Sequence, residues 1–278
     1  MGYVIPVLIF AGLGVVSGIL LTVASKIFEV KTDPRVDEIN NILPQANCGS
    51  CGYSGCSGYA DAIVNSNAPV NMCRPGGAEC AKKIAAVMGT EAGDVAKMTA
   101  VVCCSGECGA VRSKYDYDGQ QTCISANRFY NGSKECTHAC LGFGDCAAAC
   151  PQDAITIVDG LAHVDRRSCI GCGICAKTCP NHIIKIRDIT KQIDVCCSST
   201  DIGKIVRSVC AAGCIGCKMC EKKCENDAIH VIDNLARIDY DKCIVCGKCA
   251  DACPTKAIRR CGTTYEVVDG KVTVKKDA

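Results

Sequence analysis

The chain has 278 residues and 29 cysteines, and its 31 basic and 29 acidic residues leave a net charge of +2. The balanced charge gives no electrostatic footprint for nucleic acid, and without tryptophan few side chains can stack on bases, so nucleic-acid binding is excluded. An odd number of cysteines at metal-type spacings, with no cleavable secretion signal, favours reduced thiolates in the cytosol over a disulfide-bridged secreted protein.

Residues 1–25 contain no charged side chain and are dominated by Val, Leu, Ile, Gly and Ala. We expect a transmembrane helix, because about 20 apolar residues span a hydrocarbon core of roughly 30 Å. A signal peptide is the alternative, but it needs basic residues before the apolar run, and the first charge is Lys26. Lys26, Lys31 and Arg35 follow the run and, by the positive-inside rule, place the rest of the chain in the cytoplasm. The predicted location is the cell (inner) membrane, with a single pass and the cysteine-rich remainder on the cytoplasmic side.

A Cys-x2-Cys-x4-Cys-x16-Cys pattern follows a short connecting helix that Asp33 and Pro34 begin. Glycines between its first cysteines let the backbone fold tightly and point amides at sulfur, which favours a [4Fe-4S] site. Zinc is the alternative, since only one Cys-x2-Cys pair is compact. Cys80, on a helix expected over residues 78–88, is either a ligand or a buried small residue. The predicted ligands are Cys48, Cys51, Cys56 and Cys73.

An internal repeat at an offset of 74 residues governs the rest of the chain, because the segment from Asp153 to Ala162 recurs from Asp227 to Ala236. Each copy reads as two short apolar strands around a polar turn, followed by a cysteine loop, as in a ferredoxin-like unit.

The second copy carries the run Cys-x2-Cys-x2-Cys-x3-Cys twice, which is typical of two [4Fe-4S] clusters whose fourth ligands cross over. Zinc is the weaker alternative, because its sites pair two short knuckles. Glu225 stands where the motif expects proline and removes no ligand. The predicted ligand sets are Cys214, Cys217, Cys220 and Cys253 for one cluster, and Cys243, Cys246, Cys249 and Cys224 for the other.

The first copy has one regular ligand set and one incomplete set. Phe143 occupies the place of Cys217, so one cluster lacks a motif cysteine, and Cys136 is the nearest substitute. The predicted ligand sets are Cys169, Cys172, Cys175 and Cys150 for the regular cluster, and Cys140, Cys146, Cys179 and Cys136 for the other.

Further cysteines exceed the needs of five clusters, and at the offset of 74 Cys123 and Cys136 recur as Cys197 and Cys210. Four thiolates at one place would hold a sixth [4Fe-4S] cluster, so the expected cofactors are five or six such clusters. Inert buried cysteine is the alternative. The candidates for the sixth site are Cys104, Cys108, Cys123, Cys197 and Cys210.

The predicted fold class is α+β, with a transmembrane helix, a small single-cluster domain and tandem two-cluster ferredoxin-like units. The predicted parts are a transmembrane helix (1–25), a linker (26–47), a single-cluster domain (48–100), a first ferredoxin-like unit with a cysteine-rich extension (101–190), a second unit (191–262) and a tail (263–278).

This order of parts, with the segments Cys48-Gly-Ser-Cys51-Gly-Tyr-Ser-Gly-Cys56 and Cys140-Leu-Gly-Phe-Gly-Asp-Cys146, resembles the iron–sulfur subunit designated B in the Rnf complex over nearly the whole chain. The resemblance implies a subunit of an ion-translocating ferredoxin:NAD oxidoreductase that accepts electrons from reduced ferredoxin. It also implies that other subunits carry the flavins and the NAD site, and that the complex moves Na⁺ or H⁺ across the membrane.

The residues themselves indicate an electron relay, because clusters carry single electrons and we find no nucleophile beside a base, no paired acid–base carboxylates and no phosphate-binding loop. One alternative is a soluble or peripheral polyferredoxin serving another redox enzyme, and a second is an enzyme subunit that hosts a corrinoid or flavin. A basic stretch of the second unit would suit an acidic ferredoxin, although a solvated basic face is the alternative. Its residues are Lys204, Arg207, Lys218, Lys222 and Lys223.

Overall fold

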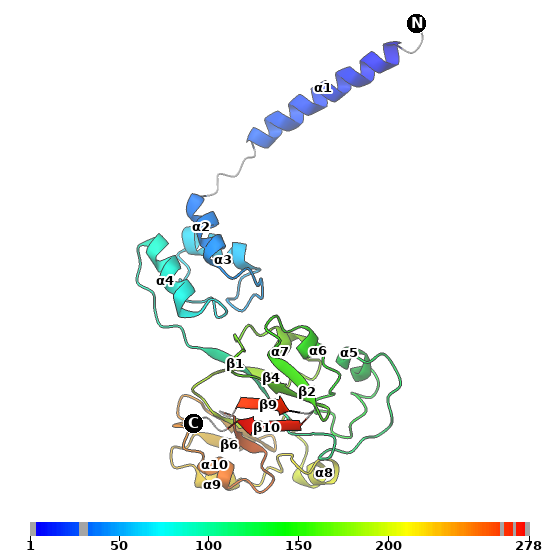
Figure 1. The fold of residues 1–278 in the computed structure, drawn as a ribbon, viewed down its shortest axis with the longest axis vertical. Coiled ribbons are helices and arrows are strands. Elements are labelled where there is room, and N and C mark those ends of the chain that lie inside the picture. Colours follow the sequence, from blue (N-terminus) through cyan, green and yellow to red (C-terminus); the bar gives the residue numbers. More distant parts are fainter. Residues whose placement is uncertain (1–3, 28–32, 262–263, 269–270, 276–278) are drawn as a thin grey trace.

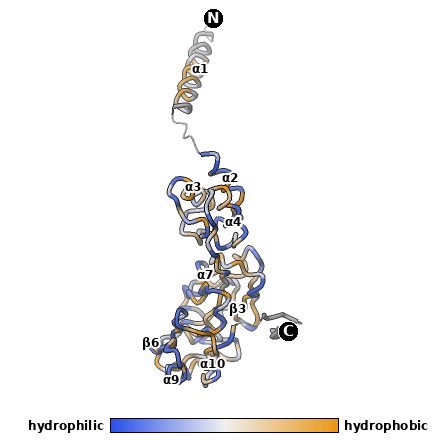
Figure 2. The backbone as a smooth tube through the Cα atoms, turned by 90° about the vertical axis from the view of Figure 1, so that its left-hand side faces the viewer, coloured by the Kyte–Doolittle hydropathy of each residue, from blue (hydrophilic) through white to orange (hydrophobic). Residues whose placement is uncertain are grey.

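The computed structural model describes the chain apart from residues 1–3, 28–32, 262–263, 269–270 and 276–278 (Figure 1). Within the described ranges, helix α1 (Val4–Ile27) is followed by a small helical domain and then by a larger part built from two-stranded sheets and short helices. Figures 1 and 2 place the helical domain between α1 and the sheet-containing part. The α+β class and the order of the cysteine-rich parts agree with the sequence prediction.

The helix expected near the N-terminus is present as α1, but its predicted role as a membrane span is not supported. Within the described part of the chain, no helix is both long enough and apolar enough to cross a membrane. The side chains described on α1 belong to residues 10–25, about 24 Å of helix at 1.5 Å per residue, which is less than the roughly 30 Å of a hydrocarbon core.

The small domain packs three helices around one apolar core: α2 (Pro34–Ile42), α3 (Cys56–Ser66) and α4 (Gly77–Met88). Asp33 caps α2 as expected, because its carboxylate accepts a hydrogen bond of 2.9 Å from the Arg35 amide. Ile39, Ile63 and Ile84 are almost fully buried, and each contributes about 1.5–3 kcal/mol by leaving water. This core fixes the loop between α2 and α3, which carries the first cysteines.

The larger part consists of antiparallel strand pairs connected by cysteine loops and short helices. The pairs are β1 (Met98–Val102) with β4 (Ile184–Asp188), β2 (Ile155–Val158) with β3 (Leu161–Val164), β5 (Ile193–Val195) with β8 (Ile258–Arg260), β6 (Ile229–Ile232) with β7 (Leu235–Ile238), and β9 (Thr264–Val268) with β10 (Lys271–Lys275). The helices are α5 (Cys123–Asn127), α6 (Asp145–Ala148), α7 (Ile174–Thr178), α8 (Gly203–Val209), α9 (Met219–Lys223) and α10 (Lys248–Asp251).

The first strands of the two units are farther apart in the chain than the repeat predicts. Val102 pairs with Ile184 and Val195 with Ile258, so the partner strands lie 74 residues apart while the first strands lie 93 apart. The first unit therefore contains 19 extra residues between its first strand and its first cysteine loop. The repeat was expected to run without gaps, but this insertion makes Cys104, rather than Cys123, the structural counterpart of Cys197.

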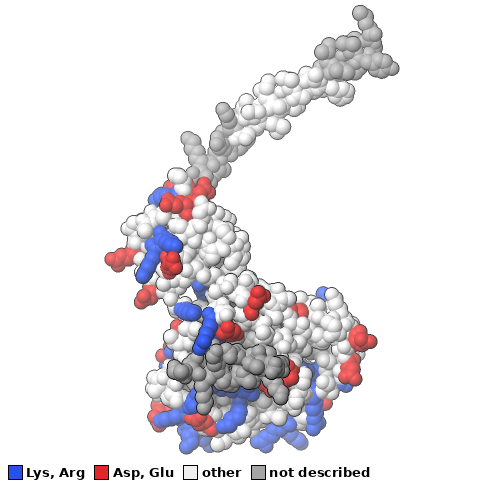
Figure 3. Space-filling model, viewed as in Figure 1, with Lys and Arg blue, Asp and Glu red and all other residues white. Residues whose placement is uncertain are grey.

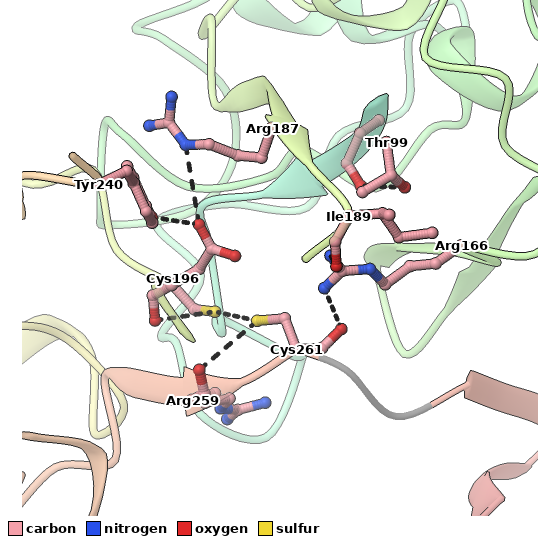
Figure 4. A network of polar contacts seen from close by, with 10 residues as sticks. Thr99, Arg166, Arg187, Ile189, Cys196, Tyr240, Arg259 and Cys261 are labelled. Atoms are coloured by element: carbon pink, nitrogen blue, oxygen red, sulfur yellow. Dashed lines mark hydrogen bonds and ion pairs between the residues drawn. The ribbon is translucent and has the colours of Figure 1, made fainter. Parts of the chain in front are cut away.

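A buried polar network joins the two units (Figure 4). Asp194 on β5 is 1% exposed, and its carboxylate accepts a hydrogen bond of 2.5 Å from the Tyr240 hydroxyl. The Arg187 guanidinium of β4 forms an ion pair with the same carboxylate at 3.8 Å and stacks on the Tyr240 ring. Burial raises the pKa of Asp194, while the Tyr240 hydroxyl and Arg187 favour its charged form. Arg166 adds hydrogen bonds to the carbonyls of Ile189 and Cys261.

We expect Tyr240→Phe to destabilise the joined units, because it removes the donor and leaves a buried carboxylate oxygen without a hydrogen bond. The loss is about 1–3 kcal/mol, which corresponds to a fall in melting temperature of about 2–4 °C per kcal/mol. Anaerobic circular dichroism measures the change. The control is Tyr115→Phe, since the Tyr115 hydroxyl donates to the Phe129 carbonyl at the surface. Equal melting temperatures for the two variants would show that the buried network is unimportant.

Candidate metal centres

Cysteines of the small domain meet on its apolar core. Cys56 opens α3, and Cys51, Cys56, Cys73 and Cys80 pack with the buried core residues. The Asn47 side-chain oxygen accepts a hydrogen bond of 2.9 Å from the Cys56 amide and fixes the turn into the helix. We call the four predicted ligands Cys48, Cys51, Cys56 and Cys73 site A.

Tyr59 and Cys80 border site A. Burial raises the pKa of Tyr59 to about 12, and the thiols of Cys73, Cys51 and Cys80 raise it further. The Tyr59 hydroxyl donates to the Pro69 carbonyl at 2.6 Å, which ties α3 to the segment leading to Cys73. Cys80 forms a side-chain hydrogen bond with Cys73 and lies close to Cys56, so the structure places it at the site without deciding between its two predicted roles.

Site B consists of the regular ligand set of the first ferredoxin-like unit, which the structure brings together: Cys150, Cys169, Cys172 and Cys175. Burial raises the pKa of Cys175 to about 12, and the thiols of Cys169, Cys172 and Cys150 raise it further. Two backbone amides donate to sulfur in this site: Ala100 to Cys169 and Ala154 to Cys150, both at 3.4 Å. Such N–H···S contacts are a recognised means of setting cluster potential.

Site A directly contacts site B. The Lys177 ammonium of α7 donates a hydrogen bond of 2.9 Å to the Cys48 carbonyl. The Cys48 thiol lies near enough to Cys172 to raise its pKa, although burial is the larger cause. The two cysteine loops are therefore neighbours in space.

The incomplete ligand set of the first unit is completed by Cys123. Burial raises the pKa of Cys146 to about 12, and the thiols that raise it further are those of Cys140, Cys123, Cys179 and, from site B, Cys175. We call Cys123, Cys140, Cys146 and Cys179 site C. These cysteines line one apolar cavity with about 360 Å³ of empty space.

The insertion brings Cys123 to the place that Phe143 leaves without a thiol. The Asp145 carboxylate accepts hydrogen bonds of 2.9 Å from the Cys123 amide and 3.1 Å from the Ile124 amide, which anchors the start of α5. The Phe143 and Gly144 amides contact the Cys123 thiol and oppose the rise in its pKa that burial causes. The Phe143 ring packs edge-on against Tyr117, also in the insertion, at 5.5 Å.

Cys136, predicted to belong to this set, lies in a different cavity with Cys104, Cys197 and Cys210. Cys108, another candidate, is exposed and lines neither cavity. A signal for the true arrangement exists in the sequence, because a Cys-Cys pair follows the first strand of each unit, as Cys103-Cys104 and as Cys196-Cys197.

The two regular sets of the second unit are also assembled. Burial raises the pKa of Cys220 to about 11, and the Cys214 and Cys217 thiols raise it further. The Ala228 amide donates to the Cys224 sulfur at 3.3 Å, repeating the contact between Ala154 and Cys150. We call Cys214, Cys217, Cys220 and Cys253 site D, and Cys224, Cys243, Cys246 and Cys249 site E.

The thiols of site E line a cavity with about 380 Å³ of empty space. Glu225, the residue in place of the motif proline, forms an ion pair with Lys248 and so connects the end of α9 to α10.

In the part of the chain that the structure describes, no three or more His, Cys, Asp or Glu side chains are grouped so that they could hold a single metal ion. The donor sets fit iron–sulfur clusters in their chemistry. They consist of soft thiol ligands in groups of four, partly buried, with backbone amides directed at sulfur.

Comparison with protein families assigns iron–sulfur motifs to the same segments. Residues 43–75 match a family described as "Putative Fe-S cluster", and residues 162–185 and 236–259 match the 4Fe-4S binding domain. These segments contain the ligands of site A and most ligands of sites B and E.

Three curated proteins, each the subunit designated B of its complex, are similar over most of the chain. The one from the Na(+)-translocating ferredoxin:NAD(+) oxidoreductase complex of Acetobacterium woodii is 44% identical over 91% of this chain and 77% of the relative. The one from the ion-translocating oxidoreductase complex of Methanosarcina acetivorans is 42% identical over 90% of this chain and 95% of the relative. The one from the proton-translocating ferredoxin:NAD(+) oxidoreductase complex of Clostridium ljungdahlii is 39% identical over 89% of this chain and 88% of the relative.

We expect Cys123→Ser to remove a ligand of site C. Its anaerobically purified form should lose about four irons per chain, or leave a [3Fe-4S] centre with a new signal in the oxidised electron paramagnetic resonance (EPR) spectrum. Cys103→Ser is the control, because Cys103 lines neither cavity. Unchanged iron and spectrum in Cys123→Ser would exclude Cys123 as a ligand.

Proposed function

The chain belongs to the family of iron–sulfur subunits, designated B, of ion-translocating oxidoreductase complexes, and on this premise we propose that it relays single electrons from reduced ferredoxin through [4Fe-4S] clusters into such a complex. The complex would reduce NAD and move Na⁺ or H⁺ across a membrane. The chain is then an enzyme subunit without a site for bond chemistry of its own.

One observation carries the relay: the cysteine sites adjoin one another. Site A contacts site B through Cys48 and Cys172, and site B adjoins site C through Cys175 and Cys146. Sites D and E are built by the equivalent loops of the second unit. A bound cluster at each site supplies one-electron chemistry, while the protein sets the spacing and the potentials through burial and amide contacts.

We assign five clusters to sites A to E. Cys123 replaces Cys136 as the fourth ligand of site C, and the other ligands are those predicted from the motifs. The alternative of a polyferredoxin serving another enzyme is less well supported, because the similarity to the subunit of an ion-translocating complex extends over about 90% of the chain.

Reduced ferredoxin is proposed to dock at site D. The five basic side chains of α8, α9 and the residue before α9 are all exposed, and Figure 3 shows basic side chains gathered at this end of the molecule. Cys217 itself is exposed beside Met219, so the site D thiols reach the surface here. Positive charge around an accessible redox site favours an acidic donor and accelerates its encounter.

Reversing Lys218, Lys222 and Lys223 to Glu should slow reduction by ferredoxin by about tenfold or more at low salt, because steering is lost. Reduction by dithionite should be unchanged. The control reverses the exposed Arg74, Lys82 and Lys97 of the helical domain and its linker, which changes the net charge equally. Stopped-flow absorbance in anaerobic buffer measures both rates, and equal slowing of the two triple variants would exclude docking at site D.

Helix α1 is proposed to anchor the chain in the cytoplasmic membrane, with every site on the cytoplasmic side. Its described large apolar side chains are exposed, Phe10 at 76% and Leu21 at 71%, and Figure 2 shows apolar residues along this isolated helix. A contiguous apolar surface of this kind marks a protein or membrane contact. The basic residues that follow favour the cytoplasmic side.

We expect the chain to remain in the membrane fraction after carbonate washing, and deletion of residues 1–25 to release it. Leu13→Asp with Leu20→Asp should also release it, because each charge costs about 2.5–3.5 kcal/mol at the centre of a bilayer. Asp61→Asn with Asp94→Asn serves as a surface control. Protease added to intact cells should spare the ferredoxin-like units. Retention of both α1 variants, or cleavage from outside, would contradict the anchor or its orientation.

A further inference from the structure

A second group of four thiols lies between the two ferredoxin-like units. Cys104 and Cys136 come from the first unit, and Cys197 and Cys210 come from the second. All four line one cavity with about 380 Å³ of empty space, as large as the cavity at site E. Burial raises the pKa of Cys136 to about 12, and the thiols of Cys104, Cys197 and Cys210 raise it further.

We propose that Cys104, Cys136, Cys197 and Cys210 hold a further [4Fe-4S] cluster, the junction site, which connects the clusters of the two units. This inference rests on the proposed relay and adds the step between its two halves.

The hydrogen bonds around the junction site repeat in both units. The Cys104 sulfur accepts from the amides of Gly106 at 3.3 Å and Cys140 at 3.4 Å. The Cys197 sulfur accepts from the equivalent Cys214 amide at 3.3 Å and contacts the Ser199 amide. Spare thiols would not require this repetition, whereas a cluster between two related units does.

Cys136 and Cys210 are equivalent in the same way. The His138 amide contacts the Cys136 thiol, and the Ala212 amide at the repeat position contacts the Cys210 thiol. Each thiol of the junction site therefore has a backbone amide directed at its sulfur, as the thiols of sites B and E have at Cys150, Cys169 and Cys224.

Backbone contacts between the units close the cavity. Val111 forms an antiparallel bridge with Cys210, and the Arg112 amide donates to the Val209 carbonyl at 3.1 Å. The Ala211 amide donates to the Ala110 carbonyl at 2.8 Å. These bonds hold ligands from distant parts of the chain in one place without a local cysteine motif.

A buried cation compensates the negative charge that deprotonated thiols would bring. Lys134 is 6% exposed, and its ammonium donates to the carbonyls of Gly106 at 3.0 Å and Gly160 at 2.8 Å. It lies close enough to Cys140 and Cys210 to oppose the rise in their pKa that burial causes. A buried ammonium without a carboxylate partner is costly, and an anionic cluster beside it would offset that cost.

The junction site lies between site C and site D. The Cys140 amide of site C contacts Cys104, and the Cys214 amide of site D contacts Cys197. A cluster here would accept one electron from a reduced cluster on one side and pass it to the oxidised cluster on the other. No bond or proton changes in this step.

Two other cysteines near the cavity are better explained without the cluster. Cys196 also lines it, but its sulfur lies 3.7 Å from the Cys261 sulfur (Figure 4). Cys108 is exposed and lies beside Gly160. Neither is assigned as a ligand.

Iron and sulfide analysis of the anaerobically purified full chain tests the proposal. With the junction site the chain should contain about 24 irons, and without it about 20, at four per cubane. Cys210→Ser should lose about four irons or leave a [3Fe-4S] EPR signal, while Cys108→Ser should match the wild type. Cys175→Ser, at site B, should lose about four irons whatever the junction site holds.

A wild-type value near 20 that Cys210→Ser does not change would overturn the junction site and leave the proposed relay intact. Absence of loss in Cys175→Ser would instead contradict the relay. If Cys210→Ser does not fold, the wild-type iron count alone decides, because it needs no variant. In a folded Cys210→Ser variant, ferredoxin should reduce sites B and C at least about tenfold more slowly, while dithionite reduces them normally. An unchanged ferredoxin rate would remove the connecting role.

Discussion

Buried thiols take the place of aliphatic side chains in much of this chain, and that substitution constrains the rest of the structure. Cysteines belong to the apolar clusters of the helical domain and of both ferredoxin-like units. Burial raises the pKa of Cys146 and Cys175 to about 12, so these thiols are protonated at neutral pH when no cation is bound. Cluster binding reverses this preference by stabilising the thiolates, and it therefore couples cofactor binding to folding.

The duplicated architecture follows from this coupling. Each unit contains two hairpin-like strand pairs that would be marginally stable alone, and four thiols of each loop pair supply the remaining attachment points. The joint between the units uses a different means, the buried contact of Asp194 with Tyr240 and Arg187. The repeat thus supplies the cluster geometry, and the joint fixes one unit against the other.

Local spacing could be predicted from the sequence, and contacts between distant segments could not. The ligands of sites B, D and E sit in short motifs whose order along the chain determines their positions, apart from one crossed-over cysteine. Cys123 was misplaced because the register of the repeat hides the insertion of 19 residues. Once β1 and β5 are aligned, Cys104 matches Cys197, and Cys136 moves from site C to the junction. Residues 1–25 gave the correct helix, but periodicity alone does not establish a membrane span.

The central claim is that electrons move through the chain from site D to site A, rather than remaining where they enter. Freeze-quench EPR after mixing the oxidised full chain with reduced ferredoxin tests this most directly, with a Cys56→Ser variant identifying the site A signal. The account predicts that second-unit signals form first and decline as the site A signal grows. Electrons that stay in the second unit at all times, while dithionite reduces site A, would contradict it.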